Sequence, residues 1–145
     1  MNAKKCLCIC AILLLLLSSH AFVEEWVKIG LGGSGDSYYY DAASVSKSGA
    51  NRVTYWGKVE FASSASIDEA IKMRRSIGLK TAGYSKLKVS FALEEIDCKL
   101  RKSRNLAAKD LDQNGKVLDQ RKVSGPWDEI LPGTVYDRTH TLICH

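Results

Sequence analysis

The positions of the five cysteines constrain the fold of this chain more than any other feature of its sequence. Three of them, Cys6, Cys8 and Cys10, lie in an apolar run near the N-terminus, and Cys98 and Cys144 lie 46 positions apart in the remainder. If the run is removed on export, we expect the two remaining cysteines to form one disulfide, because exported small domains commonly pair their cysteines. Closing such a loop stabilises a domain by about 4 kcal/mol in the chain-entropy model. Two free thiols are the alternative, and an intact-mass measurement without reductant distinguishes the two states.

The N-terminal segment has the three parts of a secretory signal peptide. Lys4 and Lys5 supply a basic start, residues 6–17 form a run of 12 apolar residues, and Ser19 and Ala21 are the small residues before a cleavage site. A membrane anchor is the alternative interpretation. A helix of 12 residues spans only about 18 Å, however, which is short of the ~30 Å hydrocarbon core of a bilayer.

Cleavage after Ala21 gives a signal peptide of residues 1–21 and one domain of residues 22–145. The loss of two lysines leaves 19 Lys and Arg against 16 Asp and Glu, so the mature net charge is +3. That balance gives no argument for a nucleic-acid partner. A bacterial lipid anchor needs a cysteine at the end of the apolar run, whereas the three cysteines of this run lie at its beginning. No second long apolar run follows, so no transmembrane segment is expected after cleavage.

Most of the domain alternates polar and apolar residues, which is typical of strands with one buried face. Aromatic and β-branched residues, which pack well on a pleated surface, are frequent in the same segments. Asn114-Gly115 is a strong signal for a type I′ turn and predicts a hairpin between its two flanking strands. The expected strands are residues 25–29, 37–40, 52–61, 86–98, 99–109 and 116–123, with a flexible turn at 30–35 and a turn or one helical turn at 41–47 that closes at 48–51.

Residues 62–85 interrupt the strand pattern. Ser66 and Glu69 have the S-x-x-E spacing of a capping box, apolar residues follow at helical spacing, and Gly78 provides a stop signal. We therefore expect a short helix in this segment. The tail, residues 134–144, fits the spacing of a helix and of a strand equally well, and the residues alone leave both open.

Two motifs resemble ligand-binding loops but lack the context that each chemistry needs. The segment from Gly30 to Gly35 fits G-x-G-x-x-G, yet a strand is expected after it, so no helix N-terminus is available to hold a pyrophosphate. The segment from Asp110 to Gly115 resembles the first half of a calcium loop, but Arg121 occupies the twelfth position in place of a bidentate carboxylate. Both segments are expected to connect strands and to bind no ligand.

Residues that ligate metals or act as nucleophiles are sparse in the mature sequence. Its two histidines, His140 and His145, lie in the last six residues beside Cys144, which is better used in a disulfide. We expect solvent-facing histidines there and no metal site. Ser34 lacks the second glycine of a nucleophile elbow because the next position but one is Asp36, and no pair of carboxylates stands out. The sequence therefore predicts no cofactor and no enzymatic activity.

The most prominent charged stretch follows Cys98 directly and contains Lys99, Arg101, Lys102 and Arg104. On a strand, alternation would place Lys99 and Arg101 on one face and the other two on the opposite face. The simpler interpretation is a solvated strand, such as a sheet edge protected by its charge. The alternative is that these four residues form a site for an anionic partner, such as a sulfated glycan, a lipopolysaccharide headgroup or an acidic protein surface.

Six aromatic residues lie on the first expected strands, and alternation requires some of them to face outward. They are Trp26, Tyr38, Tyr39, Tyr40, Tyr55 and Trp56. Most are expected in the core. Outward-facing members could form an interface, so the sequence leaves open a homodimer in which part of this group pairs two subunits.

A series of short motifs runs through nearly the whole mature chain. They are WVKIG at residues 26–30, YYD at 39–41, SV at 44–45, VTYWGK at 53–58, IDC at 96–98, RNL at 104–106 and WDEILPGT at 127–134, followed by Cys144. In their order and spacing, together with a signal peptide and two cysteines, they resemble the bacterial surface-adhesin protein E family. Residues 62–85 contain no matching motif.

The resemblance implies an α+β fold, which is mainly an antiparallel β-sheet with a short inserted helix and a C-terminal helix. A disulfide between Cys98 and Cys144 would tie the second helix to one face of the sheet, so the resemblance favours a helix for residues 134–144. It also implies location in the cell envelope and, for the named member of the family, adhesion to host extracellular-matrix proteins. Only the two cysteines carry over to this chain, and the missing lipobox leaves surface display unsupported.

The leading interpretation is an exported, non-catalytic binding protein of the periplasm or the cell surface. It resembles surface adhesins, needs no cofactor, binds no nucleic acid and recognises a protein or an anionic glycan in the envelope or outside the cell. The alternative is a periplasmic inhibitor of an envelope enzyme such as lysozyme, because such inhibitors are also small, exported, disulfide-bonded β proteins.

Overall fold

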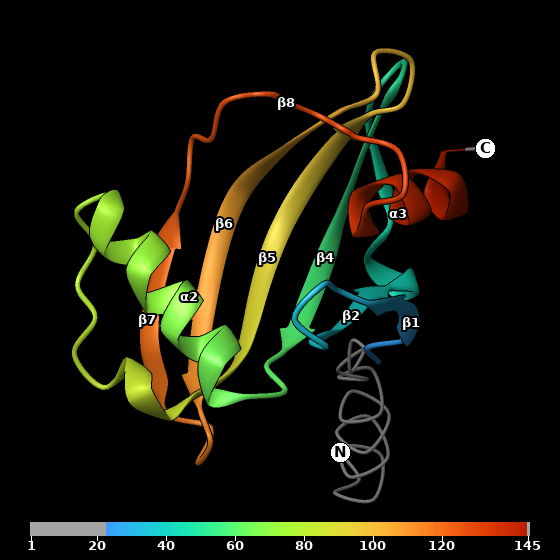
Figure 1. The fold of residues 1–145 in the computed structure, drawn as a ribbon. Coiled ribbons are helices and arrows are strands. Elements are labelled where there is room, and N and C mark those ends of the chain that lie inside the picture. The colour runs from blue at the N-terminus through green and yellow to red at the C-terminus, as the bar shows by residue number, and fades with distance from the viewer. Residues whose placement is uncertain (1–22, 145) are drawn as a thin grey trace, which may run out of the picture.

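The computed structural model describes residues 23–144, and the predicted signal peptide of residues 1–21 lies outside the described residues. The described chain forms an antiparallel sheet of eight strands in the order β1-β2-β4-β5-β6-β7, with β3 paired to β4 and β8 paired to β6 (Figure 1). The strands are β1 (Trp26–Leu31), β2 (Ser37–Asp41), β3 (Ser46–Gly49), β4 (Arg52–Glu60), β5 (Leu87–Asp97), β6 (Lys102–Asp112), β7 (Val117–Lys122) and β8 (Asp128–Glu129). The helices are α2 (Ser64–Ser76) and α3 (Val135–Ile143), with short 3-10 turns η2 (Ala42–Ser44) and η3 (Tyr84–Lys86). The predicted α+β fold class is confirmed.

Both helices lie on one side of the curved sheet, which we call the helix face (Figure 1). On this face Tyr55 of β4 lies opposite Glu94 of β5. The next pair in the register, Trp56 and Leu93, points to the other side because strand side chains alternate. We call that other side the helix-free face, since neither α2 nor α3 lies on it.

The core lies on the helix face, between the sheet and α3. Tyr55, Ile96 and Ile130 are its buried members, at 1%, 0% and 5% exposure, and the disulfide packs against them. Cys98 and Cys144 are bonded with 5.5 Å between their Cα atoms, so the predicted tie between the C-terminal helix and the sheet is confirmed. The helical assignment of the tail is also confirmed.

The strand predicted at residues 99–109 begins three residues later than expected. Residues 98–101 form a turn, and β6 starts at Lys102. The Asp97 carboxylate accepts a hydrogen bond from the Leu100 amide at 2.9 Å, a side-chain turn that competes with strand pairing. Arg101, the last residue of this turn, has a left-handed φ of 52°. The extended backbone therefore resumes only at Lys102.

The hairpin predicted at Asn114-Gly115 is present between β6 and β7, but its turn is not type I′. Only Gly115 has a positive φ, of 77°, whereas a type I′ turn needs two such residues. The Asp112 side chain decides the geometry, because its Oδ1 accepts from the amides of Asn114 and Lys116 at 2.8 and 2.9 Å. The result is a four-residue loop with a register shift in the following ladder.

The inserted helix is present, but its cap lies three residues earlier than predicted. Ser63 is the N-cap and its hydroxyl accepts from the Ser66 amide at 3.2 Å, while the Ser66 hydroxyl accepts from the Ser63 amide at 3.3 Å. This serine pair takes the place of the expected pair of Ser66 and Glu69. The predicted stop is present, since Gly78 has a φ of 74° just after the helix.

The strand β3 was expected to be part of a turn. It pairs with β4 from Ser46 to Gly49 and has no apolar residue, so alternation gave no signal for it. Within residues 23–144, no helix is long and apolar enough to cross a membrane.

Candidate functional site

The predicted basic stretch is divided between a turn and a strand, so its four side chains have different surroundings. Lys99 and Arg101 lie in the turn after β5, and Lys102 and Arg104 lie on β6. Lys99 and Arg101 are exposed, and the other two are partly buried. Each of the two arginines has an acidic partner.

Arg101 connects the turn after β5 to α3. Its Nη2 donates to Asp137 Oδ1 at 2.6 Å, and its Nη1 lies 3.3 Å from His140 Nδ1. His140 Nε2 in turn lies 3.0 Å from the Cys98 carbonyl oxygen, so the tautomer with its proton on Nε2 satisfies both contacts. The Gly133 amide, and then Arg101, lower the pKa of Asp137 below its usual value. Arg101 therefore holds the helix beside the disulfide.

Arg104 is engaged on the helix-free face, at the end of the sheet near the β3–β4 hairpin. Its Nε donates to Glu95 Oε2 at 2.8 Å, and its guanidinium lies 4.5 Å from the centroid of the Trp127 ring. Burial alone would raise the pKa of Glu95, but hydrogen bonds from Ser48 and Arg104 lower it. The charge of Arg104 is thus largely balanced by Glu95.

Lys99 contributes to a different feature, an open groove of about 510 Å³ beside the disulfide. Lys47 of β3 and Arg52 of β4 line the same groove, so basic residues from three segments contribute to its lining. The walls and floor are formed by Val45, Ser46, Gly49, Ala50, Asn51, Val53, Cys98, Ile143 and Cys144. These lining residues include no aspartate and no glutamate. We call this feature the basic groove.

The basic groove depends on contacts that the sequence pattern did not reveal. The Cys98 amide donates to the Asn51 carbonyl at 2.8 Å, which holds the β3–β4 hairpin against the turn that carries Lys99. The Arg52 guanidinium has two neighbours outside the groove lining, Asp97 Oδ2 at 3.7 Å and the Trp127 ring, whose centroid is 5.3 Å away. The sequence pattern did not indicate Lys47 or Arg52, because each is an isolated cation. The pairing of β3, which has no apolar alternation, brings them to Lys99.

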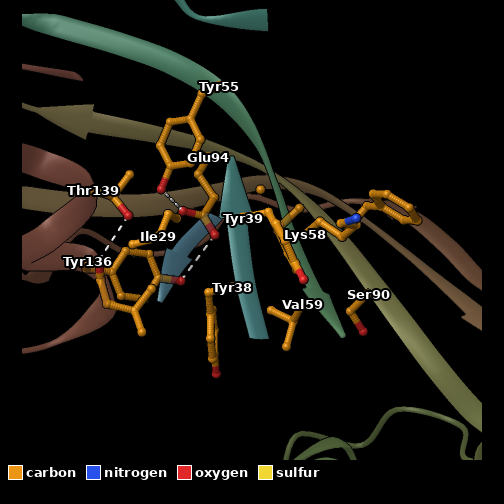
Figure 2. Close-up of a pocket in the computed structure, with 14 residues that line it drawn as sticks. Ile29, Tyr38, Tyr39, Tyr55, Lys58, Val59, Ser90, Glu94, Tyr136 and Thr139 are labelled. Carbon is orange, nitrogen blue, oxygen red and sulfur yellow. Dashed lines mark hydrogen bonds between the residues drawn. The ribbon is translucent and has the colours of Figure 1, made fainter. Parts of the chain in front are cut away.

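A second polar feature lies under α3 on the helix face, where Glu94 is buried between two tyrosines (Figure 2). Tyr55 donates to Glu94 Oε2, and Tyr136 of α3 donates to Oε1 at 3.2 Å. Burial raises the pKa of Glu94 to about 7. The charge of Glu94 raises the pKa of Tyr136, and burial followed by that same charge raises the pKa of Tyr55.

A carboxyl group with a pKa near 7 has the acidity of a general acid or base, so its surroundings decide what it does. Both carboxyl oxygens of Glu94 already accept a hydrogen bond, and the hollow beside it measures only about 80 Å³. One of the two donors comes from the sheet and the other from α3. The arrangement therefore fastens the helix to the sheet and uses both carboxyl oxygens in contacts within the fold.

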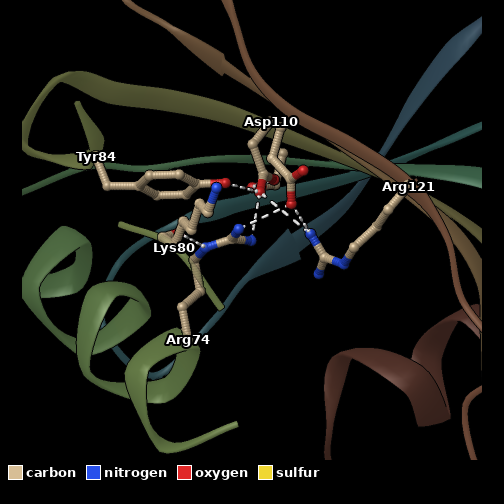
Figure 3. Close-up of polar contacts among 7 residues, drawn as sticks. Arg74, Lys80, Tyr84, Asp110 and Arg121 are labelled. Atoms are coloured by element: carbon tan, nitrogen blue, oxygen red, sulfur yellow. Dashed lines mark hydrogen bonds and ion pairs between the residues drawn. The ribbon is translucent and has the colours of Figure 1, made fainter. Parts of the chain in front are cut away.

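A third polar cluster fastens α2 to the other end of the helix face (Figure 3). Arg74 donates to Asp110 Oδ2 at 3.0 Å and to Asp119 Oδ2 at 2.8 Å. Tyr84 donates to the same Asp110 oxygen at 2.7 Å, and Arg121 pairs with Asp119. The Arg74 side chain is only 10% exposed, so its partners replace the water that burial removes.

The motifs that resembled ligand sites have structural surroundings. Residues 30–35 contain the last two residues of β1 and most of the loop to β2, so the predicted turn begins two residues later than expected. Asp110 accepts hydrogen bonds from Ser90, Tyr84 and Arg74, and Asp112 shapes the hairpin turn. His145 lies outside the described residues. In the described part of the chain, no group of three His, Cys, Asp or Glu residues has an arrangement that could hold a metal ion.

Comparison with known proteins identifies one family. The model of the surface-adhesin protein E family matches residues 26–145, which include every strand and both helices. No curated protein matches the chain in a search by sequence. Because the family match covers most of the chain, from β1 onward, the chain belongs to the surface-adhesin protein E family.

Proposed function

We propose that this protein is an exported, non-catalytic adhesin-like protein that binds an anionic macromolecule at the basic groove. Membership of a surface-adhesin family supports binding as its role and the cell surface or another exported location as its site of action. The two buried polar clusters support the absence of catalysis, because their carboxylates are occupied by hydrogen bonds within the fold.

The choice of an anionic partner rests on one observation. Lys47, Arg52 and Lys99 line one open groove whose lining has no acidic side chain. Like charges that converge from separate segments produce a local potential that attracts anions more strongly than an isolated lysine does. A sulfated glycan or an acidic protein surface has the matching charge, and a groove open to solvent admits a polymer.

The four residues singled out in the sequence have unequal roles in this proposal. Lys99 contacts the partner. Lys102, on the adjacent strand β6, adds to the positive potential. Arg101 and Arg104 act as positioning residues, because the first is tied to α3 and the second to Glu95.

Retention on immobilised heparin, eluted by a rising salt gradient, tests the proposal. The wild-type domain is expected to bind at low salt and to elute as the charges are screened. Lys47→Ala with Lys99→Ala should elute at clearly lower salt. A matched double variant, Lys72→Ala with Lys116→Ala, removes the same charge from exposed positions outside the groove and should elute close to the wild type. An equal decrease in the eluting salt concentration for both double variants would mean that net charge alone determines retention. That result would overturn the basic groove as the binding site.

A lysozyme inhibition assay separates this function from the alternative role of enzyme inhibitor. The proposal expects no inhibition at nanomolar concentrations of the domain. Nanomolar inhibition would instead favour a periplasmic inhibitor.

Fractionation of the native cells addresses location, with the mature protein expected in the periplasm or outside the cell.

A further inference from the structure

The helix-free face differs from the solvent face of an ordinary antiparallel sheet. Such a face is usually polar, because alternate side chains meet water. Here Trp26 of β1, Trp56 of β4 and Phe91 of β5 lie close together on it, and each is partly buried by its neighbours. The Trp26 and Phe91 rings are 5.7 Å apart between centroids and inclined by 51°. Aromatic rings gathered on an uncovered face indicate an interaction surface.

These rings line an open hollow of about 250 Å³, which we call the aromatic hollow. Its lining consists of Glu24, Trp26, Asp41, Trp56, Phe91 and Lys109. The volume equals that of about eight liquid water molecules, which suits a single six-membered sugar ring. Apolar walls with a few polar groups at fixed positions are the usual composition of a small-molecule site.

The aromatic wall is held in place before any ligand arrives. Trp26 Nε1 donates to Glu24 Oε2 at 2.9 Å, which fixes the plane of the indole. The Lys58 ammonium lies 4.9 Å from the centroid of the same ring and 4.2 Å from that of Tyr39. A ring that is already fixed loses little freedom on binding, so weak contacts with its face are not offset by an ordering cost.

The polar groups of the aromatic hollow suit a ligand rich in hydroxyl groups. Asp41 Oδ1 accepts from the Glu25 and Ala43 amides at 2.7 and 3.1 Å, which locks the carboxylate in position. Among the described residues, no hydrogen bond uses its Oδ2. A carboxylate accepts from hydroxyl or N–H groups, and the Lys109 ammonium donates to oxygen atoms.

We propose that the aromatic hollow binds one neutral pyranose ring of a glycan. The Trp26 and Trp56 rings pack against its C–H face, Asp41 and Glu24 accept from its hydroxyl or acetamido N–H groups, and Lys109 donates to a ring substituent. Two carboxylates against one lysine in the lining disfavour a sulfated or carboxylated sugar. The occupant therefore differs in charge from the partner of the basic groove, and binding at the two sites can be tested independently.

Proton NMR of the tryptophan indole groups tests the inference on the intact mature domain. The probes are methyl β-glucopyranoside, N,N′-diacetylchitobiose and, as the anionic comparison, a heparin disaccharide. One or both neutral sugars are expected to shift the Trp26 indole Nε1–H resonance saturably, with a dissociation constant in the millimolar range. The Trp127 resonance, on a ring between Arg52 and Arg104, should not respond to them.

Two variants locate the effect. Trp56→Ala removes one wall and should abolish the shift, and its folding is checked by the remaining indole resonances. Glu24→Gln lies at an exposed position and should weaken binding by about fivefold without disturbing the fold. Lys72→Ala, on the outer side of α2, should bind like the wild type. Neither Trp56→Ala nor Glu24→Gln should alter retention on heparin, so failure of one site is distinguishable from failure of the other.

Three outcomes would overturn the inference. The first is the absence of a saturable Trp26 shift with either neutral sugar. The second is a shift that survives in both variants. The third is an indole shift that depends on protein concentration without sugar, which would assign this face to a second copy of the chain.

Discussion

At the scale of single residues, Glu94 is the side chain that departs most from what alternation predicts. Leu87, Val89, Phe91 and Leu93 alternate along β5, and an apolar row of this kind ordinarily faces the core. The structure turns Phe91 and Leu93 to the helix-free face and Glu94 to the core. The sequence predicts the strand correctly, but it cannot predict the buried face. Two tyrosines from distant segments, one of them on α3, supply the partners that Glu94 needs.

The raised pKa of Glu94 makes stability depend on pH. Its value of about 7 in the folded protein exceeds the ordinary 4.5. The unfolded chain therefore releases this proton first as pH rises, and the free energy of unfolding falls between the two values. We expect a loss of about 3 kcal/mol from this group by pH ~8, and Glu94→Gln should remove that component.

Urea unfolding of both proteins across this pH range measures the effect. Every other titratable group is shared by the two proteins, so the difference between their pH profiles isolates Glu94. Parallel pH profiles would contradict the assignment of the buried carboxyl group as the source of the pH dependence.

At the scale of elements, polar contacts determine the positions of both helices on the sheet. The inserted helix carries a buried arginine, and Arg74 meets Asp110 and Asp119 on neighbouring strands. Helical spacing and the expected capping box of Ser66 and Glu69 predicted α2 to within a few residues. The ion pairs could not be predicted from sequence patterns, because their members lie 36 and 45 positions apart. The strands β3 and β8 were not predicted, because neither has an alternation of polar and apolar residues.

Replacing Arg74 should loosen α2 from the sheet. Arg74→Met removes the partner of a buried carboxylate, Asp110, which is expected to cost about 3–5 kcal/mol in the free energy of unfolding. Denaturant unfolding measures the loss. Arg75→Met, at the exposed next position of the same helix, is the control and should change stability by less than about 0.5 kcal/mol. Similar losses for both variants would mean that general helix propensity, and not the buried pair, holds α2.

At the scale of the whole molecule, the disulfide joins the C-terminal helix to the end of the sheet that carries the basic groove. Both of its cysteines line the groove together with Lys99. The pairing of Cys98 with Cys144 could be predicted from the sequence because removal of the predicted signal peptide would leave only these two cysteines. The groove could not, because it needs the β3–β4 hairpin to be placed beside the turn after β5.

Loss of the disulfide should weaken both stability and the site. The double variant Cys98→Ser with Cys144→Ser is expected to lower the free energy of unfolding by about 4 kcal/mol, as the closed loop of 46 residues implies. Thermal unfolding with and without reductant provides the measurement. Retention on heparin should fall as well, because Cys98 and Cys144 form part of the groove floor. An unchanged melting temperature on reduction would contradict the structural role of the bond.

Binding at the basic groove is tested most directly by mapping a heparin hexasaccharide on the isotope-labelled domain by backbone amide NMR. We expect saturable shifts concentrated at Lys47, Arg52 and Lys99, with little change along α2, and loss of those shifts as salt is raised. Shifts spread evenly over exposed lysines, or confined to a surface away from the disulfide, would contradict it.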